Sequence, residues 1–512
     1  MAAQRAIVIG AGVAGLVTAG LLAARGLDVT VLERAAGPGG KMREVAVAGQ
    51  RLDAGPTVFT MRWVLDEVFQ ELGTSLAAHL VLKPAETLAR HAWDGGGRLD
   101  LFADIDRAAD AIGDFAGAAE ARGYRAFCAR AQHIYQTLEQ PFIRSERPTP
   151  VSLVRGAGIG GLGDMWRISP FSTLWRALGE HFHDPRLQQL FGRYATYCGS
   201  SPFDAPATLM LVAHVEQQGV WLVEGGMHRI AVALAGLAEA HGARLRYGAD
   251  VREITTESGR VSGVVLASGE RIAGDVVVAN ADPSALAGGL FGPGVRKAVD
   301  AVPVRERSLS ALTWAMVARP SGFPLVRHNV FFSAGYAQEF TDIAAGRLPG
   351  APTVYVCAQD RGDSDGAAPA GDERLFLIVN APANGDRRHF STSEIAACAR
   401  QTFALLERCG LTLATQAETI TTPAGFEALF PATGGALYGR AQQGSMAAFR
   451  RAGARTKLPG LFLAGGATHP GPGVPMAAMS GRLAASSVLA SISAASRPRS
   501  RPAATPGGMS MR

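Results

Sequence analysis

A glycine turn between an apolar strand and an apolar helix, close to the start of the chain, constrains the fold more than any other feature. The segment 5–35 has the pattern of a strand, a glycine turn, a helix rich in Ala and Leu, and a second strand at residues 28–32. Glu33 ends that second strand, where a carboxylate can accept hydrogen bonds from ribose hydroxyls. The turn has the form GxGxxG, which permits close approach of the backbone to a pyrophosphate, and its glycines are Gly10, Gly12 and Gly15. This βαβ unit predicts a Rossmann-like dinucleotide site for NAD or FAD.

A second pair of glycines follows the predicted ribose-binding strand and favours FAD. The segment GPGGKMRE at 37–44 carries Gly39, Gly40 and Lys41, and DAGPTVFT follows at 53–60. With these motifs the chain resembles the superfamily of FAD-containing amine oxidases and phytoene desaturases, in which the second glycine pair and the basic residue after it approach FAD. The family often has Arg at the position of Lys41. The resemblance also implies cofactor contacts in the second motif, at Gly55, Pro56 and Thr57.

The third motif lies near the end of the chain, at 461–485, and consists of a strand, a Gly/Pro loop and a helix of small residues. Small residues let backbone N–H groups at a helix start come close to a flat ring. The resemblance implies that FAD and its isoalloxazine are lined here by Gly465, Gly466, Gly473, Val474 and Met476. It also implies that the backbone of Val251 meets the adenine and that Asn280 closes the site. No Cys follows Cys409, so we expect non-covalent FAD.

At 512 residues the chain is too long for one growing core. We expect an α/β (α+β) architecture with an FAD-binding domain of the amine oxidase/phytoene desaturase type and a discontinuous substrate or lid domain. The first comprises 1–95, 221–284 and 441–490, the second, facing the membrane, comprises 96–220 and 285–440, and 491–512 is a disordered tail. An antiparallel meander is expected from strands at 243–252, 259–267 and 271–279.

Three segments narrow the resemblance to one branch of the superfamily. They resemble the corresponding segments of carotenoid desaturases and lie at 53–69, 193–208 and 467–476. The TMRW extension at 60–63 favours the branch of 1-hydroxycarotenoid 3,4-desaturases, also called methoxyneurosporene dehydrogenases. The resemblance implies that a C=C bond is introduced into a hydroxylated acyclic carotenoid, such as a hydroxyneurosporene, by hydride transfer to flavin. Phytoene desaturation, another FAD oxidase activity on amines or porphyrinogens, and prenyl-lipid binding without redox chemistry remain alternatives.

Candidate residues for chemistry and substrate contact are few. His469, in the loop next to the flavin, is the best polar candidate for catalysis, although it could equally bond to backbone. Thr60 and Arg62 could meet a terminal hydroxyl group. Alternatively, Arg62 pairs with Asp66 one helical turn later.

The formal charge is +6, from 50 Lys and Arg against 44 Asp and Glu, but no basic stripe with interleaved aromatics is evident. Nucleic-acid binding is therefore not expected, and the five scattered cysteines predict no metal site.

The segment 141–176 combines five Arg and two acids with Trp166, Phe171 and Trp175, which suits either a lipid headgroup interface or a core. We expect a cytoplasmic protein that associates peripherally with the inner or photosynthetic membrane lipid surface. No second nicotinamide site is evident in the sequence. We therefore expect reduced flavin to pass its electrons to oxygen, a quinone or another membrane carrier.

Overall fold

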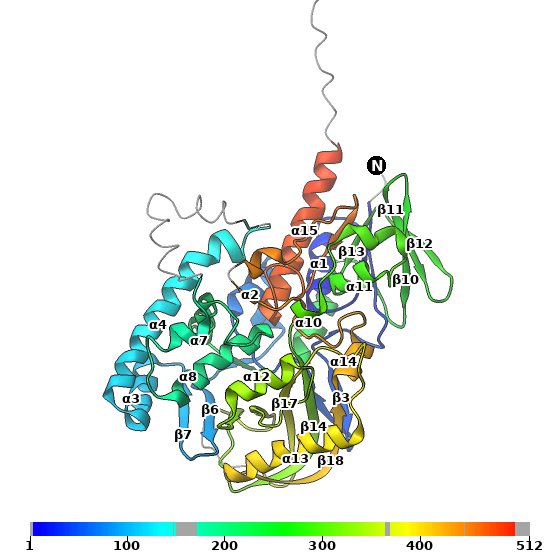
Figure 1. Cartoon of the computed structure of the whole chain (residues 1–512). Coiled ribbons are helices and arrows are strands. Elements are labelled where there is room, and N and C mark those ends of the chain that lie inside the picture. Colours follow the sequence, from blue (N-terminus) through cyan, green and yellow to red (C-terminus); the bar gives the residue numbers. More distant parts are fainter. Residues whose placement is uncertain (1–3, 147, 150–170, 364–368, 445, 497–512) are drawn as a thin grey trace, which may run out of the picture.

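The computed structural model describes residues 4–146, 148–149, 171–363, 369–444 and 446–496. A parallel five-stranded sheet forms the centre of one half of the molecule (Figure 1). Its strands, in spatial order, are β19 (Leu461–Leu463), β13 (Val276–Ala279), β1 (Arg5–Ile9), β2 (Asp28–Leu32) and β9 (Arg244–Arg246). The expected βαβ unit is confirmed, because β1 and β2 pair in parallel with α1 (Val13–Ala23) between them in the chain.

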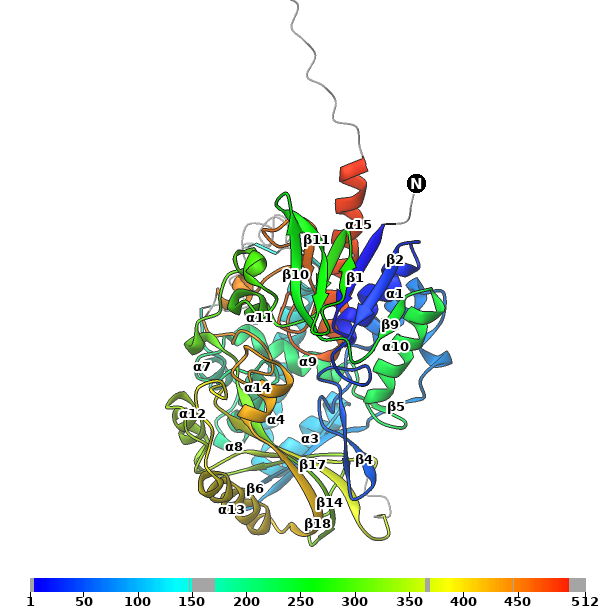
Figure 2. The same ribbon diagram turned by 90° about the vertical axis from the view of Figure 1, so that its right-hand side faces the viewer.

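Alternate residues of the parallel strands enter two different cores. Ala6 and Val8 pack against a helical layer, whereas Ile7 and Ile9 pack against a small antiparallel sheet on the opposite face. The helical layer consists of α1, α2 (Arg62–Glu71), α10 (His228–Ala240) and α15 (Val474–Ser496). The antiparallel sheet consists of β10 (Val251–Glu257), β11 (Arg260–Leu266) and β12 (Arg271–Ala273) (Figure 2). Burial on both faces explains the nearly continuous apolar sequence of these parallel strands.

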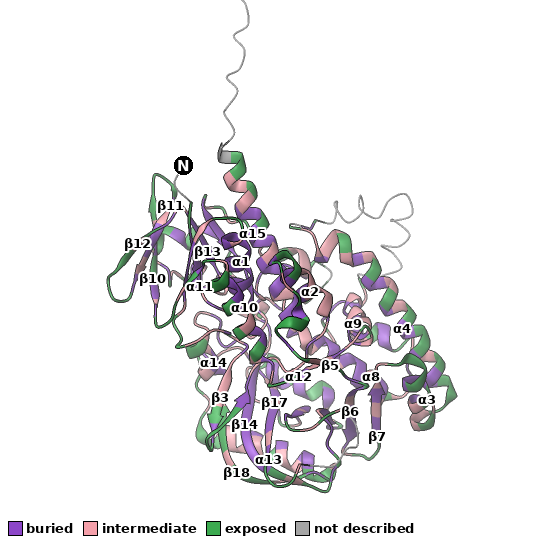
Figure 3. Ribbon diagram, turned by 180° about the vertical axis from the view of Figure 1, so that it is seen from behind, coloured by how far each residue is buried: buried purple, intermediate pink, exposed green. Residues whose placement is uncertain are grey.

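The first and last helices pack against each other at the centre of this half. A Cβ at Gly481 of α15 would lie 2.5 Å from the carbonyl oxygen of Ala14, so the contact depends on the absence of a side chain. Thr18 donates from its hydroxyl to the carbonyl of Gly481 at 3.0 Å. All of α1 is buried (Figure 3). α15 continues to Ser496, beyond the expected helix end at 490, and residues 497–512 of the expected tail lie outside the described residues.

The expected antiparallel meander is correct only in its middle. β10, β11 and β12 are antiparallel, but the outer segments of the expected meander divide into separate strands. β9 pairs in parallel with β2, and β13 pairs in parallel with β1. The breaks fall at residues 247–250 and 274–275, and β13 is buried along its whole length, as a central parallel strand must be. The alternating pattern alone did not distinguish these strands from the meander.

The other half of the molecule is built on a seven-stranded sheet with the order β18-β14-β17-β16-β15-β6-β7. The strands are β6 (Thr87–Trp93), β7 (Arg98–Phe102), β14 (Ser310–Ser321), β15 (His328–Phe332), β16 (Val354–Ala358), β17 (Glu373–Ala381) and β18 (Thr412–Thr421). α13 (Thr392–Arg408), which begins with a capping box at Ser391, covers one face of the sheet. β6 and β7 pair with each other and both belong to this sheet. The expected domain boundary at residue 95 falls in the hairpin between them and would separate the two strands.

A mainly helical layer packs beside the β6 end of this sheet. Its core is aromatic, with Phe182 and Phe191 stacked at 4.8 Å and Phe127 against both. It contains α3 (Ile105–Ala116), α4 (Ala118–Leu138), α7 (Leu174–Leu178), α8 (Pro185–Gly192), α9 (Leu211–Gln217) and the 3-10 helices η3 (Arg193–Cys198) and η4 (Ala207–Met210). Its described part agrees with the expected helical content between 100 and 220.

Smaller elements connect these parts. They are the hairpin β3 (Glu44–Val47) with β4 (Gln50–Asp53), the pair β5 (Leu82–Pro84) with β8 (Trp221–Val223), and the helices α11 (Pro283–Gly288), α12 (Tyr336–Ala344) and α14 (Pro423–Leu429). The β3–β4 hairpin reaches the seven-stranded sheet, where Val47 and Leu52 share a core with Ala315 and Val317. The hairpin therefore ties the glycine motifs of one half to the sheet of the other.

Candidate active site

One cavity of about 670 Å³ lies between the two halves of the molecule. The ends of β1, β2 and β13 border it on one side, and β14, β16 and β17 form its floor on the other. The loop before α15 and the 3-10 helix η3 complete its walls. Because all of these segments meet at one space, a ligand can extend from the parallel sheet to the seven-stranded sheet.

The two predicted glycine motifs touch each other at the parallel-sheet end. Gly12 forms a bridge with Gly39, whose N–H donates to the carbonyl of Ala11 at 2.8 Å. Gly10 has φ +97°, a conformation that favours glycine, and its N–H donates to the carbonyl of Leu32. Gly10, Gly12, Gly39 and Gly40 all line the cavity, and α1 begins beside them without an acidic residue in its first turn. The positive end of the helix dipole therefore meets the cavity.

Glu33 lies in the cavity wall at the end of β2, as expected. Its two carboxylate oxygens accept hydrogen bonds from the N–H groups of Ala11 and Ala35, each at 2.7 Å. These bonds hold the carboxylate in place while leaving further lone pairs for a ribose hydroxyl. Val251, where the adenine is expected, lines the same end of the cavity at the start of β10.

Asn280 stands at the end of β13 and joins the first and last motifs. Its side-chain oxygen accepts from the N–H of Gly15 at 3.1 Å, and its side-chain nitrogen donates to the carbonyl of Ala464 at 2.9 Å. Gly15 itself does not line the cavity: a Cβ there would lie 2.1 Å from the carbonyl oxygen of Gly10. The third glycine of the motif thus serves close packing, and Asn280 fixes the relative position of the two loops.

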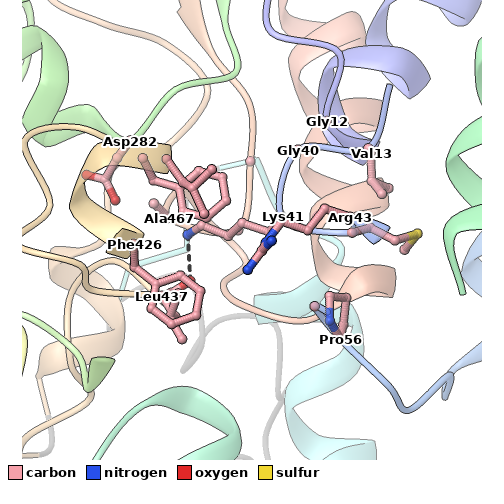
Figure 4. Close-up of a pocket in the computed structure, with 18 of the residues that line it drawn as sticks. Gly12, Val13, Gly40, Lys41, Arg43, Pro56, Asp282, Phe426, Leu437 and Ala467 are labelled. Carbon is pink, nitrogen blue, oxygen red and sulfur yellow. Dashed lines mark hydrogen bonds between the residues drawn. The ribbon is translucent and has the colours of Figure 1, made fainter. Parts of the chain in front are cut away.

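Lys41 is a buried cation in the wall of the cavity (Figure 4). Its Nζ donates to the carbonyl of Leu437 at 2.6 Å and lies 5.4 Å from the ring centre of Phe430. Burial lowers the pKa of Lys41, and the nearby carboxylate of Asp282 partly opposes that shift. The side chain makes one hydrogen bond to a backbone carbonyl. A single bond of this kind does not need the planar guanidinium of Arg, the residue that the family often has at this position.

The start of α15 forms the opposite wall. Gly465, Gly466, Gly473, Val474 and Ala477 line the cavity, whereas Met476, also expected at the flavin, does not. Met476 packs against the core of the helical layer instead, because it lies on the other side of the first helical turn. Arg451, whose pKa burial lowers to about 10, donates to the carbonyls of Tyr438 and Gly466 and holds these loops together.

The floor of the cavity follows from the alternation of the seven-stranded sheet. Leu312, Trp314, Val354, Val356, Leu377 and Val379 face the core under α13. Their neighbours in sequence face the cavity, and they are Ala311, Thr313, Thr353, Tyr355, Phe376, Ile378 and Asn380. Gly55, Pro56 and Thr57 lie at the edge of this floor, where the Thr57 hydroxyl is 2.7 Å from that of Tyr355.

A polar corner of the cavity was not predicted from the sequence. η3 places Arg193, Thr196 and Tyr197 in the cavity wall. Thr196 and Tyr197 follow Arg193 by three and four residues. This helical spacing is the sequence signal that could have predicted a common face for the three side chains. Tyr197 and Tyr194 donate from their hydroxyls to the two oxygens of buried Glu216, each at 2.7 Å.

The residues proposed from sequence for catalysis and hydroxyl binding lie elsewhere. His469 is buried and does not line the cavity; its Nε2 donates to the carbonyl of Phe142 at 2.9 Å, and burial lowers its pKa to about 4. Thr60 and Arg62 also lie outside the lining. Arg62 pairs with Asp66 at 3.2 Å and lies over the ring of Trp221, which is the structural alternative given above.

The residues present fit FAD. Two helix starts and a cradle of glycines face the cavity, and a Cβ at Gly12 would lie 2.7 Å from Asn280 Oδ1, so the cradle tolerates no larger residue there. A carboxylate at the end of β2 and a second glycine-lined loop before α15 complete the set for the two halves of a dinucleotide.

Comparison with known proteins agrees with this geometry. Residues 13–489 match the family model for flavin containing amine oxidoreductases. Among solved structures, an oxidoreductase from Methanosarcina mazei has a TM-score of 0.57 at 17% identity, covering 95% of this chain and 100% of that chain. The cyclohexylamine oxidase of Brevibacterium oxydans has a TM-score of 0.54 at 14% identity, covering 96% and 100%. These two likenesses establish the shared fold.

The chain therefore belongs to the flavin-containing amine oxidoreductase family and to its carotenoid desaturase branch, and FAD as its cofactor is confirmed. It is 58% identical over 513 residues to the hydroxyneurosporene desaturase of Rubrivivax gelatinosus, covering 99% of this chain and 97% of that protein. It is 46% identical to the hydroxyneurosporene desaturase of Cereibacter sphaeroides, covering 96% and 99%. The predicted resemblance is confirmed.

Proposed function

We propose that the protein introduces the 3,4 double bond into acyclic carotenoids that carry a hydroxyl group at C1, with FAD as oxidant. The relatives named above support this assignment, as does a 1-hydroxycarotenoid 3,4-desaturase of a Flavobacterium that is 29% identical over 494 residues. The observation that supports it most is one cavity that joins a dinucleotide cradle to a floor with Tyr355, Phe376 and Ile378 and to a polar corner at η3. Such a floor suits a polyene with one polar end.

We propose that the predicted cofactor residues in the cavity wall bind FAD. The adenosine half is assigned to Glu33 and Val251, the pyrophosphate to the start of α1, and the flavin to the start of α15. Lys41 and Asn280 keep the surrounding loops in place through their bonds to Leu437, Gly15 and Ala464. The full set is Gly10, Gly12, Glu33, Gly39, Gly40, Lys41, Gly55, Pro56, Thr57, Val251, Asn280, Gly465, Gly466, Gly473 and Val474.

The reaction breaks one C–H bond on each of two neighbouring carbons and forms a C=C bond between them. FAD, when bound, accepts one of the hydrogens as hydride. The second leaves as a proton to a base or to water. The task of the chain is to bury the polyene against Phe376 and Ile378 and to hold one bond next to the flavin.

Anaerobic turnover tests this function. FAD-loaded protein is mixed with liposomes that contain either a 1-hydroxycarotenoid or phytoene, and the flavin and polyene spectra are followed together. Loss of flavin absorbance with a red shift of the hydroxycarotenoid alone is expected. Reaction with phytoene alone would assign the protein to the earlier desaturation, and reaction with neither would contradict the desaturase function.

We propose further that the protein works as a peripheral protein of the cytoplasmic face of the inner or photosynthetic membrane. A substrate that dissolves in lipid supports this proposal. None of the helices in the described ranges combines the length and apolarity needed to cross a bilayer. Of the expected interface at 141–176, residues 150–170 with Trp166 lie outside the described residues, and Trp175 packs against Phe203 at 4.8 Å. Flotation with liposomes tests the contact, and protein that stays at the bottom of the gradient would contradict it.

The electron acceptor is proposed to be oxygen, a quinone or another membrane carrier, with no second nucleotide involved. Reoxidation of the reduced protein by air, by a quinone in liposomes and by NAD distinguishes these routes. Reoxidation by NAD alone would overturn the proposal.

A further inference from the structure

Arg193 is a cation inside the molecule whose charged group meets the cavity. It begins η3 and lines the cavity wall near Tyr355 of the floor. Its guanidinium lies 5.2 Å from the ring centre of Tyr197 and 5.6 Å from that of Tyr355. Within the part of the chain that the structure describes, no side chain or carbonyl accepts a hydrogen bond from this guanidinium. Its N–H donors are therefore available to a ligand.

A network of fixed groups holds Arg193 in this position. Glu216 accepts from Tyr194 and Tyr197, so the ring of Tyr197 cannot turn away from the guanidinium. The Tyr355 hydroxyl is 2.7 Å from both the Thr57 hydroxyl and His328 Nδ1, which fixes the second ring. The two aromatic faces and the nearby carboxylate of Glu216 offset the charge without using the N–H groups. Such a site is organised before a ligand arrives.

A polyene alone gives no reason for this arrangement. Burying a cation costs several kcal/mol unless it is paired and hydrogen-bonded, and a hydrocarbon supplies no acceptor. A substrate that carries an oxygen where it meets Arg193 would supply that acceptor. Glu216 interacts favourably with the charge of Arg193, so a neutral oxygen such as that of an alcohol is sufficient as the acceptor.

We propose that Arg193 donates a hydrogen bond to the hydroxyl oxygen at the end of the substrate and so selects hydroxylated carotenoids. This inference rests on the proposed function and deepens it. Through Tyr355 and Thr57, Arg193 adjoins the segment assigned to the cofactor. Only one carbon separates the hydroxyl-bearing C1 from the C3–C4 bond, so an anchor next to the cofactor is what 3,4 regiochemistry requires. Arg193 thereby takes the role that the sequence analysis gave to Thr60 and Arg62.

The test compares two acyclic carotenoids that differ only in the C1 hydroxyl. The ratio of their kcat/KM values is measured in liposomes for FAD-loaded wild-type protein and for Arg193→Met. A hydrogen bond to a charged group corresponds to roughly a ten- to hundredfold preference, and we expect that preference to fall to about threefold or less in the variant. The fall is expected to come from a lower kcat/KM for the hydroxylated carotenoid. A preference equal to that of wild type would overturn the inference.

Arg186→Met is the matched control, since Arg186 lies seven residues earlier, pairs with Asp184 at 2.6 Å and is outside the cavity. Its preference is expected to equal that of wild type. If Arg193→Met does not load FAD, Arg193→Gln, which keeps N–H donors without the charge, decides: a several-fold lower preference supports the inference and an unchanged one contradicts it.

Equilibrium binding of the same two carotenoids, followed by quenching of tryptophan fluorescence, separates this inference from the proposed function. Absence of turnover in wild type contradicts the function. Equal binding preference in wild type and Arg193→Met contradicts the role of Arg193.

Discussion

Asn280 connects Gly15 and Ala464, so that one side chain bonds to the first and the last of the cofactor loops at 3.1 and 2.9 Å. The bond to Ala464 needs an N–H donor and the bond to Gly15 needs an acceptor, a combination that an amide supplies and a carboxylate does not. The two loops are parts of chain that are far apart in sequence, and the position of each relative to the other depends on this residue.

Asn280→Asp is expected to weaken FAD binding by roughly ten- to hundredfold. The carboxylate faces the carbonyl of Ala464 without a donor and adds negative charge at the pyrophosphate end of the cavity. Quenching of FAD fluorescence on titration of the apoprotein measures the affinity. Asn384→Asp is the control, because Asn384 also donates to a carbonyl, that of Gly346, away from the cavity. Equal losses in both variants would contradict a specific role of Asn280.

Glu33→Gln is expected to raise the dissociation constant of FAD by about tenfold or more. The amide nitrogen would face the N–H of Ala11 or of Ala35, so one backbone donor loses its partner and the ribose loses an anionic acceptor. The same titration measures the change. Glu257→Ala, an exposed carboxylate at the end of β10, should bind FAD as wild type does. Wild-type affinity in Glu33→Gln would show that the ribose does not bind there.

Gly481→Ala is expected to destabilise the protein by about 1–3 kcal/mol and to lower the thermal midpoint. The added Cβ would lie 2.5 Å from the carbonyl oxygen of Ala14 and push α15 away from α1. Gly236→Ala on the exposed side of α10 is the matched control, with nothing within 4 Å of its Cβ. That change should be neutral or stabilising by up to about 1 kcal/mol. A midpoint for Gly481→Ala at or above that of the control would refute the packing argument.

Acid should destabilise the protein partly through His469. Its pKa is about 4 in the folded protein, against 6.5 for a free side chain, because burial disfavours the imidazolium. Between these values the unfolded chain binds more protons, so stability is fully present above pH 6.5 and decreases as the pH falls toward 4, by up to about 3 kcal/mol. His469→Gln keeps an N–H for the Phe142 carbonyl but does not titrate. Its thermal midpoint should therefore fall less than that of wild type between pH 7.5 and pH 5, and parallel curves would contradict this.

The cofactor half of the site could be predicted because its chemistry is local in sequence. Gly10, Gly12 and Glu33 belong to one βαβ unit, and the turn, the helix start and the strand end follow from about thirty consecutive residues. The contact between Gly12 and Gly39 was not predicted, although both residues lie close to this unit in the sequence.

The substrate end could not be predicted in the same way. Arg193, Tyr355 and Glu216 lie on a 3-10 helix, a strand of the larger sheet and α9, and only the packing of these elements brings them together. Arg62 was a reasonable candidate from charge alone, but its guanidinium is directed to Asp66 and Trp221. His469 has the residue type of a catalyst, whereas its partner is a backbone carbonyl 327 positions earlier in the chain.

The meeting of α1 and α15 at one cavity also bears on how the protein is made. Gly10 and Gly12 are synthesised long before Gly473 and Val474, yet the two pairs line opposite walls of the same cavity. Until α15 has been made and has docked, the nascent chain has only one side of the cradle. A chain interrupted before α15 is therefore expected to stay colourless, because the flavin half of FAD has no wall to bind.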